Sequence, residues 1–191
     1  DLRIMNGASL TMEDGANVMV DKGGLTTSNG VFNGTNDYNV WYIGTASETG
    51  IEMSGSGLTD VTLELDEEDS KVAIDNAYTI NGKLTLTKGT FDMSGKDLTL
   101  KGDFEADGEG WMWADDASRL VVNGNASWTD TMHFADGGNT LDRLTLNFTG
   151  TNRHMMLGSD LTVKDVVMTN GSVLIYDNTL TLTSDGTISG N

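Results

Sequence analysis

The sequence predicts an all-β chain wound as a parallel β-helix, or β-solenoid, with rungs of ~20–24 residues. Apolar and polar residues alternate over short stretches, and Gly-containing turns end those stretches. Similar stretches return at an interval of ~82–83 residues, which forms a super-repeat. Apolar residues at helical spacing never persist for two turns, which argues against helices. Together these observations favour many short strands stacked in an array.

The alternation has a period of two, as in Leu84/Leu86 and Leu98/Leu100. Successive side chains of a strand point to opposite sides, so this period marks strands with one buried side. We therefore expect Leu98 and Leu100 to point into a core, and Thr99 between them to face solvent.

Two pairs of stretches match each other at a nearly constant separation. Leu58–Leu65 aligns with Leu141–Phe148, and Leu98–Leu100 aligns with Leu180–Leu182 at almost the same interval. Internal similarity on this scale is typical of stacked arrays, in which each unit contacts only its neighbours. We expect matched positions to occupy equivalent rungs, with Leu180 and Leu182 as buried as their partners.

The matches divide the chain into three parts within one solenoid segment. These are a partial unit (1–57), a full unit (58–140) and a second partial unit (141–191). We interpret the whole as a piece of a longer array, so neighbouring repeats of the same chain are its first expected partners.

Composition excludes several classes of partner and chemistry. The net charge is −18, from 11 Lys and Arg against 29 Asp and Glu, which disfavours nucleic acid and anionic membrane surfaces. No stretch is long and apolar enough to insert into a membrane. Cysteine is absent, which excludes disulfides, thiolate zinc sites and cysteine nucleophiles.

The order of apolar and Thr-rich motifs resembles a known class of repeats. A motif of the form L-x-x-V/L-T-L occurs at Leu58–Leu65 and in its match Leu141–Phe148, and the motifs L-T-L-T-x-G-T and L-T-L-x-G occur at Leu84–Thr90 and Leu98–Gly102. They resemble the β-strand repeats of giant secreted proteins of Bacteroidetes-type bacteria, many of them adhesins exported by type IX secretion. The resemblance implies a secreted, cell-surface or extracellular location, with surface glycans or the secretion machinery as further partners.

We therefore expect a structural, non-catalytic role as a stalk, fibre or adhesin spacer. The alternative is a carbohydrate-binding β-solenoid, and a polysaccharide-active β-helix enzyme is a third interpretation. The residues that would carry each alternative can be named.

Asp103, Glu105 and Asp107 are the candidate metal ligands. They begin like a calcium loop, with oxygen ligands at alternate positions and Gly108 in sixth place. Ala114, however, stands where the closing bidentate Glu belongs. Calcium is the only cofactor that this pattern indicates, and a solvated loop is the competing interpretation.

Trp111 and Trp113 are the candidate carbohydrate-binding residues. Their spacing puts two indoles on one side of a strand, where exposed rings would form a stacking platform for sugars. The competing interpretation is that both rings pack into the solenoid, as large aromatic side chains usually do. Trp41 and Trp128 precede similar apolar stretches and are expected in the core.

The enzymatic alternative needs a base close to carboxylates. The chain has two histidines, His133 and His154, and Asp115–Asp116 is an acidic pair whose nearest basic residue in the sequence is Arg119. No triad, phosphate loop or metalloprotease motif is present. We therefore expect no catalysis.

Overall fold

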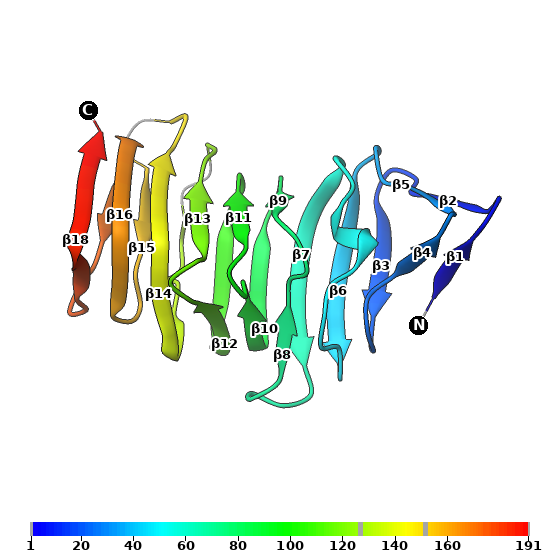
Figure 1. Cartoon of the computed structure of the whole chain (residues 1–191), viewed down its shortest axis with the longest axis horizontal. Helices are drawn as coiled ribbons and strands as arrows, with labels where there is room; N and C mark the ends of the chain where they lie inside the picture. Colours follow the sequence, from blue (N-terminus) through cyan, green and yellow to red (C-terminus); the bar gives the residue numbers. More distant parts are fainter. Residues whose placement is uncertain (1, 126–127, 151–152, 191) are drawn as a thin grey trace.

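The computed structural model describes residues 2–125, 128–150 and 153–190. The predicted fold is confirmed: the chain is a β-solenoid of about eight turns, with 60% of its residues in strands and 2% in helix. The rungs follow one another from β1 at one end to β18 at the other (Figure 1). All pairing between the named strands is parallel, as a continuously wound chain requires.

Two long ladders of paired strands run along the solenoid and meet in β14 (Phe134–Asn147). Ladder 1 leads into the start of β14. Its members, in pairing order, are β3 (Ala16–Val20), β6 (Tyr38–Gly44), β7 (Leu58–Leu65), β10 (Leu84–Asp92) and β12 (Phe104–Ala114). The short β8 (Lys71–Ala73) pairs with the end of β10.

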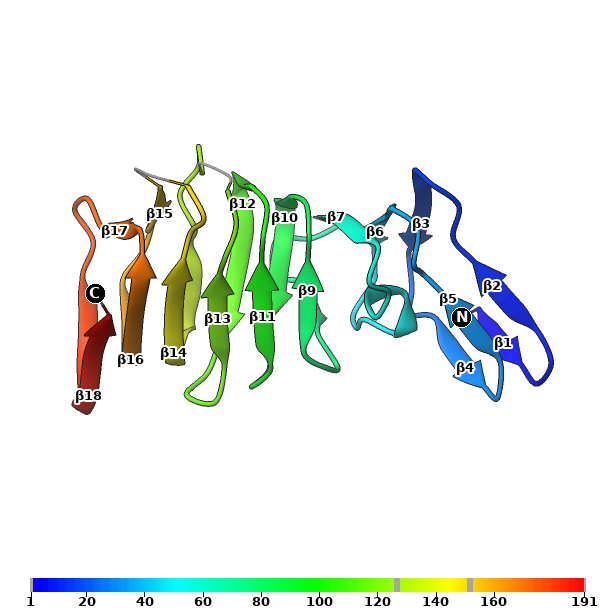
Figure 2. The ribbon, with the colours of Figure 1, turned by 90° about the horizontal axis from the view of Figure 1, so that it is seen from above.

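Ladder 2 uses the second half of β14. Its other members are β9 (Tyr78–Ile80), β11 (Asp97–Leu100), β13 (Arg119–Val122), β16 (Leu161–Asn170) and β18 (Leu180–Gly190). Figure 2 shows these strands side by side on one surface of the molecule.

The remaining strands form three small two-stranded sheets. They are β1 (Arg3–Met5) with β4 (Thr26–Ser28), β2 (Ser9–Thr11) with β5 (Val31–Asn33), and β15 (His154–Met156) with β17 (Ser172–Leu174). A 3₁₀ turn, η1 (Ile51–Met53), lies between β6 and β7 in the sequence.

The rung length agrees with the sequence prediction. Leu84 pairs with Phe104, at the lower end of the predicted range, and Leu120 pairs with Leu144, at its upper end. Rungs outside this range occur locally, because turns between the ladders differ in length. The pairing of His154 with Ser172, for example, closes a rung that is shorter than the range.

The core is one continuous apolar cluster along the solenoid axis. Leu98 and Leu100 are 0% and 1% exposed, whereas Thr99 is partly exposed. The predicted direction of these side chains is confirmed. Stacked rungs bury in this way a set of residues that no single rung could cover.

The predicted equivalence of the two sequence copies is wrong. Ladder 2 takes Leu98 to Leu120, then to Leu144, Val166 and finally Ile188. Leu180, the sequence match of Leu98, pairs instead with Leu161, earlier in β16.

The first pair of matched stretches shows the same discrepancy. Val61 in β7 pairs with Val40 and Leu84 in ladder 1, but its match Leu144 belongs to ladder 2. Alternation indicates which side of a strand is buried. Because every strand of a solenoid buries one side, the alternation is the same in both ladders. The sequence pattern therefore does not indicate which ladder a strand joins.

The last strand is also less buried than its sequence match. Leu180 and Leu182 pack on the core but stay partly exposed, and Ile188 is 62% exposed. They lie on β18, which pairs with β16 on one side. The expectation that Leu180 and Leu182 are as buried as Leu98 and Leu100 is therefore wrong.

Candidate functional site

The two candidate sugar-binding tryptophans lie on the outer surface of β12. Met112 between them is 0% exposed and points into the core, so strand alternation directs Trp111 and Trp113 outward, where both are partly buried. They border a cavity of about 300 Å³. Its lining residues are Glu68, Asp69, Lys71, Thr90, Trp111, Trp113, Ala135 and Asp136.

The indole of Trp113 is already in contact with other parts of the chain. The Lys71 Nζ lies 3.3 Å from the centroid of the Trp113 ring, a cation–π contact. A Cβ added to Gly138 would lie 2.1 Å from Trp113 Cδ2, so the Gly138 backbone packs directly against this indole. Trp111 meets His133 edge-on, with ring centroids 5.5 Å apart. Both tryptophans pack against the chain on its outside rather than inside its core.

The two remaining tryptophans behave differently from each other. Trp128 is 2% exposed and its ring centroid lies 5.2 Å from that of Phe104, which confirms the core prediction. Trp41 is 41% exposed, so the core prediction is wrong for it. Its neighbours Val40 and Tyr42 are both 0% exposed, and alternation therefore turns Trp41 outward.

The three candidate calcium ligands serve separate roles. Glu105 Oε2 lies 2.8 Å from Lys83 Nζ, and Asp103 Oδ1 accepts a hydrogen bond from the Phe104 N–H. Glu105 and Asp107 belong to the extended β12, not to a calcium loop. Across the described residues, no three or more His, Cys, Asp or Glu side chains are grouped so that they could hold a metal ion.

Asp107 lines a wide acidic groove together with carboxylates from other rungs. The groove has a volume of about 1020 Å³ and is bordered by Asp21, Glu64, Asp66, Asp107 and Glu109, with Lys88 as its cation. Lys88 Nζ is 3.9 Å from Glu109 Oε2. The strands of ladder 1 stack along the solenoid axis, so these carboxylates from successive rungs lie near one another along that axis. They account for part of the negative charge on the outer surface.

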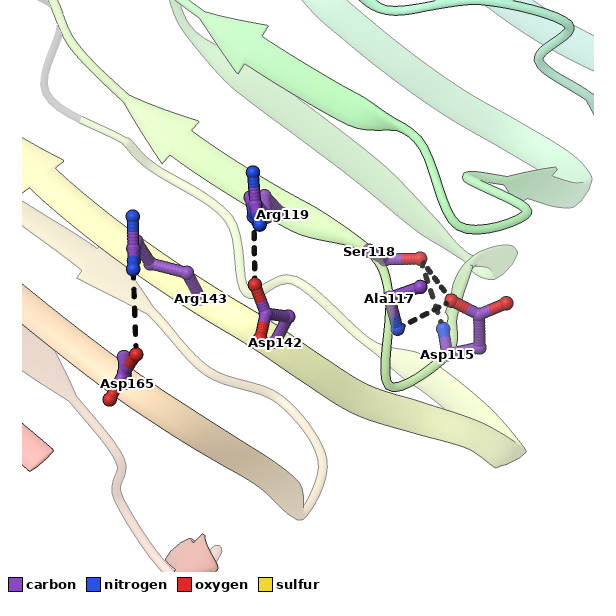
Figure 3. Close-up of polar contacts among 7 residues, drawn as sticks. All are labelled: Asp115, Ala117, Ser118, Arg119, Asp142, Arg143 and Asp165. Carbon is purple, nitrogen blue, oxygen red and sulfur yellow. Dashed lines mark hydrogen bonds and ion pairs between the residues drawn. The ribbon is translucent and has the colours of Figure 1, made fainter. Parts of the chain in front are cut away.

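The acidic pair of the enzymatic alternative is part of a turn. Asp115 Oδ1 accepts hydrogen bonds from the Ala117 N–H and the Ser118 hydroxyl, at 3.1 and 2.9 Å (Figure 3). Arg119, the basic residue expected near this pair, donates instead from Nε to Asp142 Oδ2 at 2.7 Å. This arrangement does not bring Arg119 and the acidic pair together as a catalytic unit.

Arg119–Asp142 is one of a series of ion pairs that join successive rungs on the outside of ladder 2. The next is Arg143 with Asp165, at 3.5 Å (Figure 3). The hydrogen bond from Thr187, followed by that from Arg143, lowers the pKa of Asp165. Exposed pairs of this kind contribute little stability each.

One buried polar cluster escaped the sequence interpretation. Glu52 in η1 is 0% exposed, and three of the four tyrosines, Tyr38, Tyr42 and Tyr78, direct hydroxyls toward the segment around it. Burial raises the pKa of Tyr38 to about 12 and raises that of Tyr42 well above its usual value. The available signal was the alternation of Tyr38, Val40 and Tyr42, which places both hydroxyls inside the solenoid.

Comparison of the chain with protein-family models, with curated proteins and with solved structures finds no match. Within the described residues, no helix is long and apolar enough to span a membrane.

Proposed function

We propose that this chain is a structural, non-catalytic segment that serves as a stalk, fibre or adhesin spacer of a secreted bacterial cell-surface protein. The observation that supports it most is the continuity of the two ladders, which join through β14 and pair strands from β3 to β18. Backbone hydrogen bonds between rungs and stacked core residues resist bending. A net charge of −18 keeps neighbouring chains apart.

The extracellular location and the type IX export route rest on the resemblance of the repeat motifs. The corresponding partners are neighbouring repeats of the same chain, together with surface glycans or the secretion machinery. A spacer needs length and stiffness, and a solenoid supplies both, because each rung adds ~4.8 Å along its axis.

The stiffness can be measured as a distance distribution. Because the chain has no native cysteine, spin labels can be attached at Asp14→Cys and Ser184→Cys, which are exposed and near opposite ends. A spacer gives one narrow distance, and a tandem duplication of the chain lengthens it. A broad distribution, or turnover of a polysaccharide by the purified chain, would contradict the proposal.

Carbohydrate binding is a second candidate, favoured by the outward direction of Trp111 beside a cavity with a polar rim. The carboxylates of Glu68, Asp69 and Asp136 could accept hydrogen bonds from sugar hydroxyls, and they disfavour anionic sugars. Trp111→Ala should then abolish binding on a glycan array, with Trp41→Ala as the matched exposed control. Because Lys71 and Gly138 contact Trp113, a Trp113-based platform would require Lys71 to move away.

A further inference from the structure

Ladder 2 does not extend to the N-terminal end of the molecule. The strand β4 pairs with β1 alone, and η1 lies between β4 and β9, where the next strand of the ladder would be (Figure 2). The Ile51 N–H donates to the Leu25 carbonyl oxygen at 2.9 Å, just before β4 begins. One 3₁₀ turn therefore replaces a strand between the N-terminal rungs (residues 3–44) and the shaft (residues 58–190).

The side chain of Glu52 supplies the hydrogen bonds that this replacement leaves open. Its Oε2 accepts from the Leu25 N–H at 2.7 Å, and its Oε1 accepts from the Gly50 N–H at 2.8 Å and from the Tyr42 hydroxyl at 2.6 Å. The Leu25 N–H thus donates to the Glu52 side chain, and the Leu25 C=O accepts from the Ile51 N–H. A neighbouring strand would bond the same two backbone groups. A carboxylate that is 0% exposed is tolerated only with such partners.

The backbone around Glu52 is held from both sides. The Tyr38 hydroxyl donates to the Glu52 carbonyl oxygen at 2.6 Å, and the Tyr78 hydroxyl of β9 lies 3.3 Å from the Gly50 carbonyl oxygen. The two chain segments approach so closely that a Cβ on Gly24 would lie 2.4 Å from the Gly50 nitrogen. Such close contact depends on glycine at this position and leaves no room for a shifted η1.

Ladder 1 remains unbroken on the other side of the same junction. The strand β6 pairs with β3 and with β7, with one register shift between Tyr38 and Val40 in the second pairing. The N-terminal rungs are therefore attached to the shaft by this sheet and the backbone bonds of Gly34 and Tyr38 to Gly57 on one side, and by the Glu52 contacts on the other.

We propose that Glu52 is a latch that holds the N-terminal rungs closed on the shaft. When the Glu52 contacts are broken, β1 and β4 separate from η1 and the first rungs open about the β6–β7 pairing, while the shaft stays folded. The latch makes this junction the first place where the solenoid opens. It goes beyond the spacer role and does not depend on it.

The test is amide hydrogen exchange of the full chain carrying Glu52→Gln. The Gln amide nitrogen cannot accept hydrogen bonds, so one of the sites that Leu25, Gly50 and Tyr42 use is lost. We expect the amides of Leu25 and Ile51, whose hydrogen bonds cross the junction, to exchange about 10- to 100-fold faster, with unchanged exchange in β11 and β13. Glu13→Gln, which removes the same charge from an exposed position of the first rung, should leave both regions unchanged.

Tyr42→Phe provides a second variant if Glu52→Gln does not fold. It removes one of the three donors to the carboxylate and should give a smaller acceleration confined to the same amides, whereas Tyr176→Phe, at a position 62% exposed, should give none. Equal acceleration at Leu25, at Ile51 and throughout β11 and β13 would show that Glu52 supports the whole fold and would overturn the latch. Unchanged exchange at Leu25 would also overturn it.

Discussion

The N-terminal rungs and the shaft are built from the same alternating sequence pattern, yet they differ in how completely they bury it. In the shaft, inward residues such as Leu84, Leu98 and Leu120 are 0% exposed. In the N-terminal rungs before β6, Leu10 on β2 and Val18 on β3 remain partly exposed, and only at β6 do the inward residues become fully buried. The sheets also differ, because β1–β4 and β2–β5 contain two strands each, whereas ladder 2 continues from β9 to β18.

This difference shows that burial in a solenoid depends on neighbours and not on the residue itself. A rung gains its core contacts from the rungs before and after it, so stability is approximately a sum of interfaces between neighbours. A rung with one neighbour, or one next to a 3₁₀ turn, makes fewer of these contacts. The N-terminal rungs compensate with a buried polar cluster, while the shaft relies on apolar stacking.

The largest expected effect is the loss of a core side chain in the shaft. Leu100→Ala should lower the free energy of unfolding by ~2–5 kcal/mol, the range for emptying a packed site. Leu10→Ala in the N-terminal rungs should cost less, because Leu10 is already partly exposed and its site can relax. Urea unfolding followed by circular dichroism measures both.

Thr99→Ala is the control and should change the free energy of unfolding by well under ~1 kcal/mol. Leu182→Ala should resemble Leu10→Ala, since Leu182 lies partly exposed on the last strand. Equal penalties for Leu100 and Leu182 would contradict the dependence of burial on neighbours.

A smaller effect is expected from alkaline pH, and it should be confined to the polar cluster. Burial raises the pKa of Tyr38 to about 12, above its ordinary value of 10.0. Burial also raises the pKa of Tyr42 well above that ordinary value. The folded state therefore keeps protons that the unfolded chain releases. The stability that results is fully present below about pH 10 and is lost as the pH rises through the folded-state values.

Limited proteolysis between pH ~9 and ~11 can follow this loss, since an opened segment is cleaved first. We expect new cleavage near Gly23 and Gly24 before any cleavage within the shaft. Tyr42→Phe should weaken the pH dependence, because the phenyl ring has no proton to lose. Simultaneous cleavage of the shaft would show that the cluster is not a local feature of the N-terminal junction.

Substitutions on the outer surface of the shaft should change the stability still less. Lys71→Ala removes the ammonium that stacks on Trp113 and should lower the free energy of unfolding by under ~1 kcal/mol, as for exposed cation–π pairs. The tryptophan fluorescence should change at the same time, because the indole becomes accessible to water. Lys22→Ala, at an exposed position of the N-terminal rungs, should leave the fluorescence unchanged.

The smallest effect is expected from the ion pairs between rungs. Arg119→Ala breaks the ion pair with Asp142. The side chain of Arg119 is 47% exposed and that of Asp142 is 19% exposed. Solvent screens such pairs, so the urea midpoint should stay within experimental error at both low and high salt. A clear drop at low salt would mean that the series of ion pairs acts cooperatively along ladder 2.

The sequence by itself determined the class of fold and the side of a strand that is buried. Strict alternation is sufficient for the buried side, because a period of two fixes Leu98 and Leu100 on one side and Trp111 and Trp113 on the side opposite Met112. The same rule, applied to Val40 and Tyr42, would have placed Trp41 outside. The core prediction for Trp41 rested on the apolar stretch next to it, and that stretch does not fix the side of the strand on which Trp41 lies.

Only the tertiary structure decided which ladder each strand joins, because turn length sets the ladder and alternation is the same in all of them. It likewise decided that Asp103, Glu105 and Asp107 do not form a metal-binding group, since Glu105 and Asp107 lie on the extended β12 and not in a loop. The burial of Glu52 depends on Leu25, 27 residues earlier in the chain, and on Tyr42, 10 residues earlier. Contacts between rungs create that site, and no local pattern encodes it.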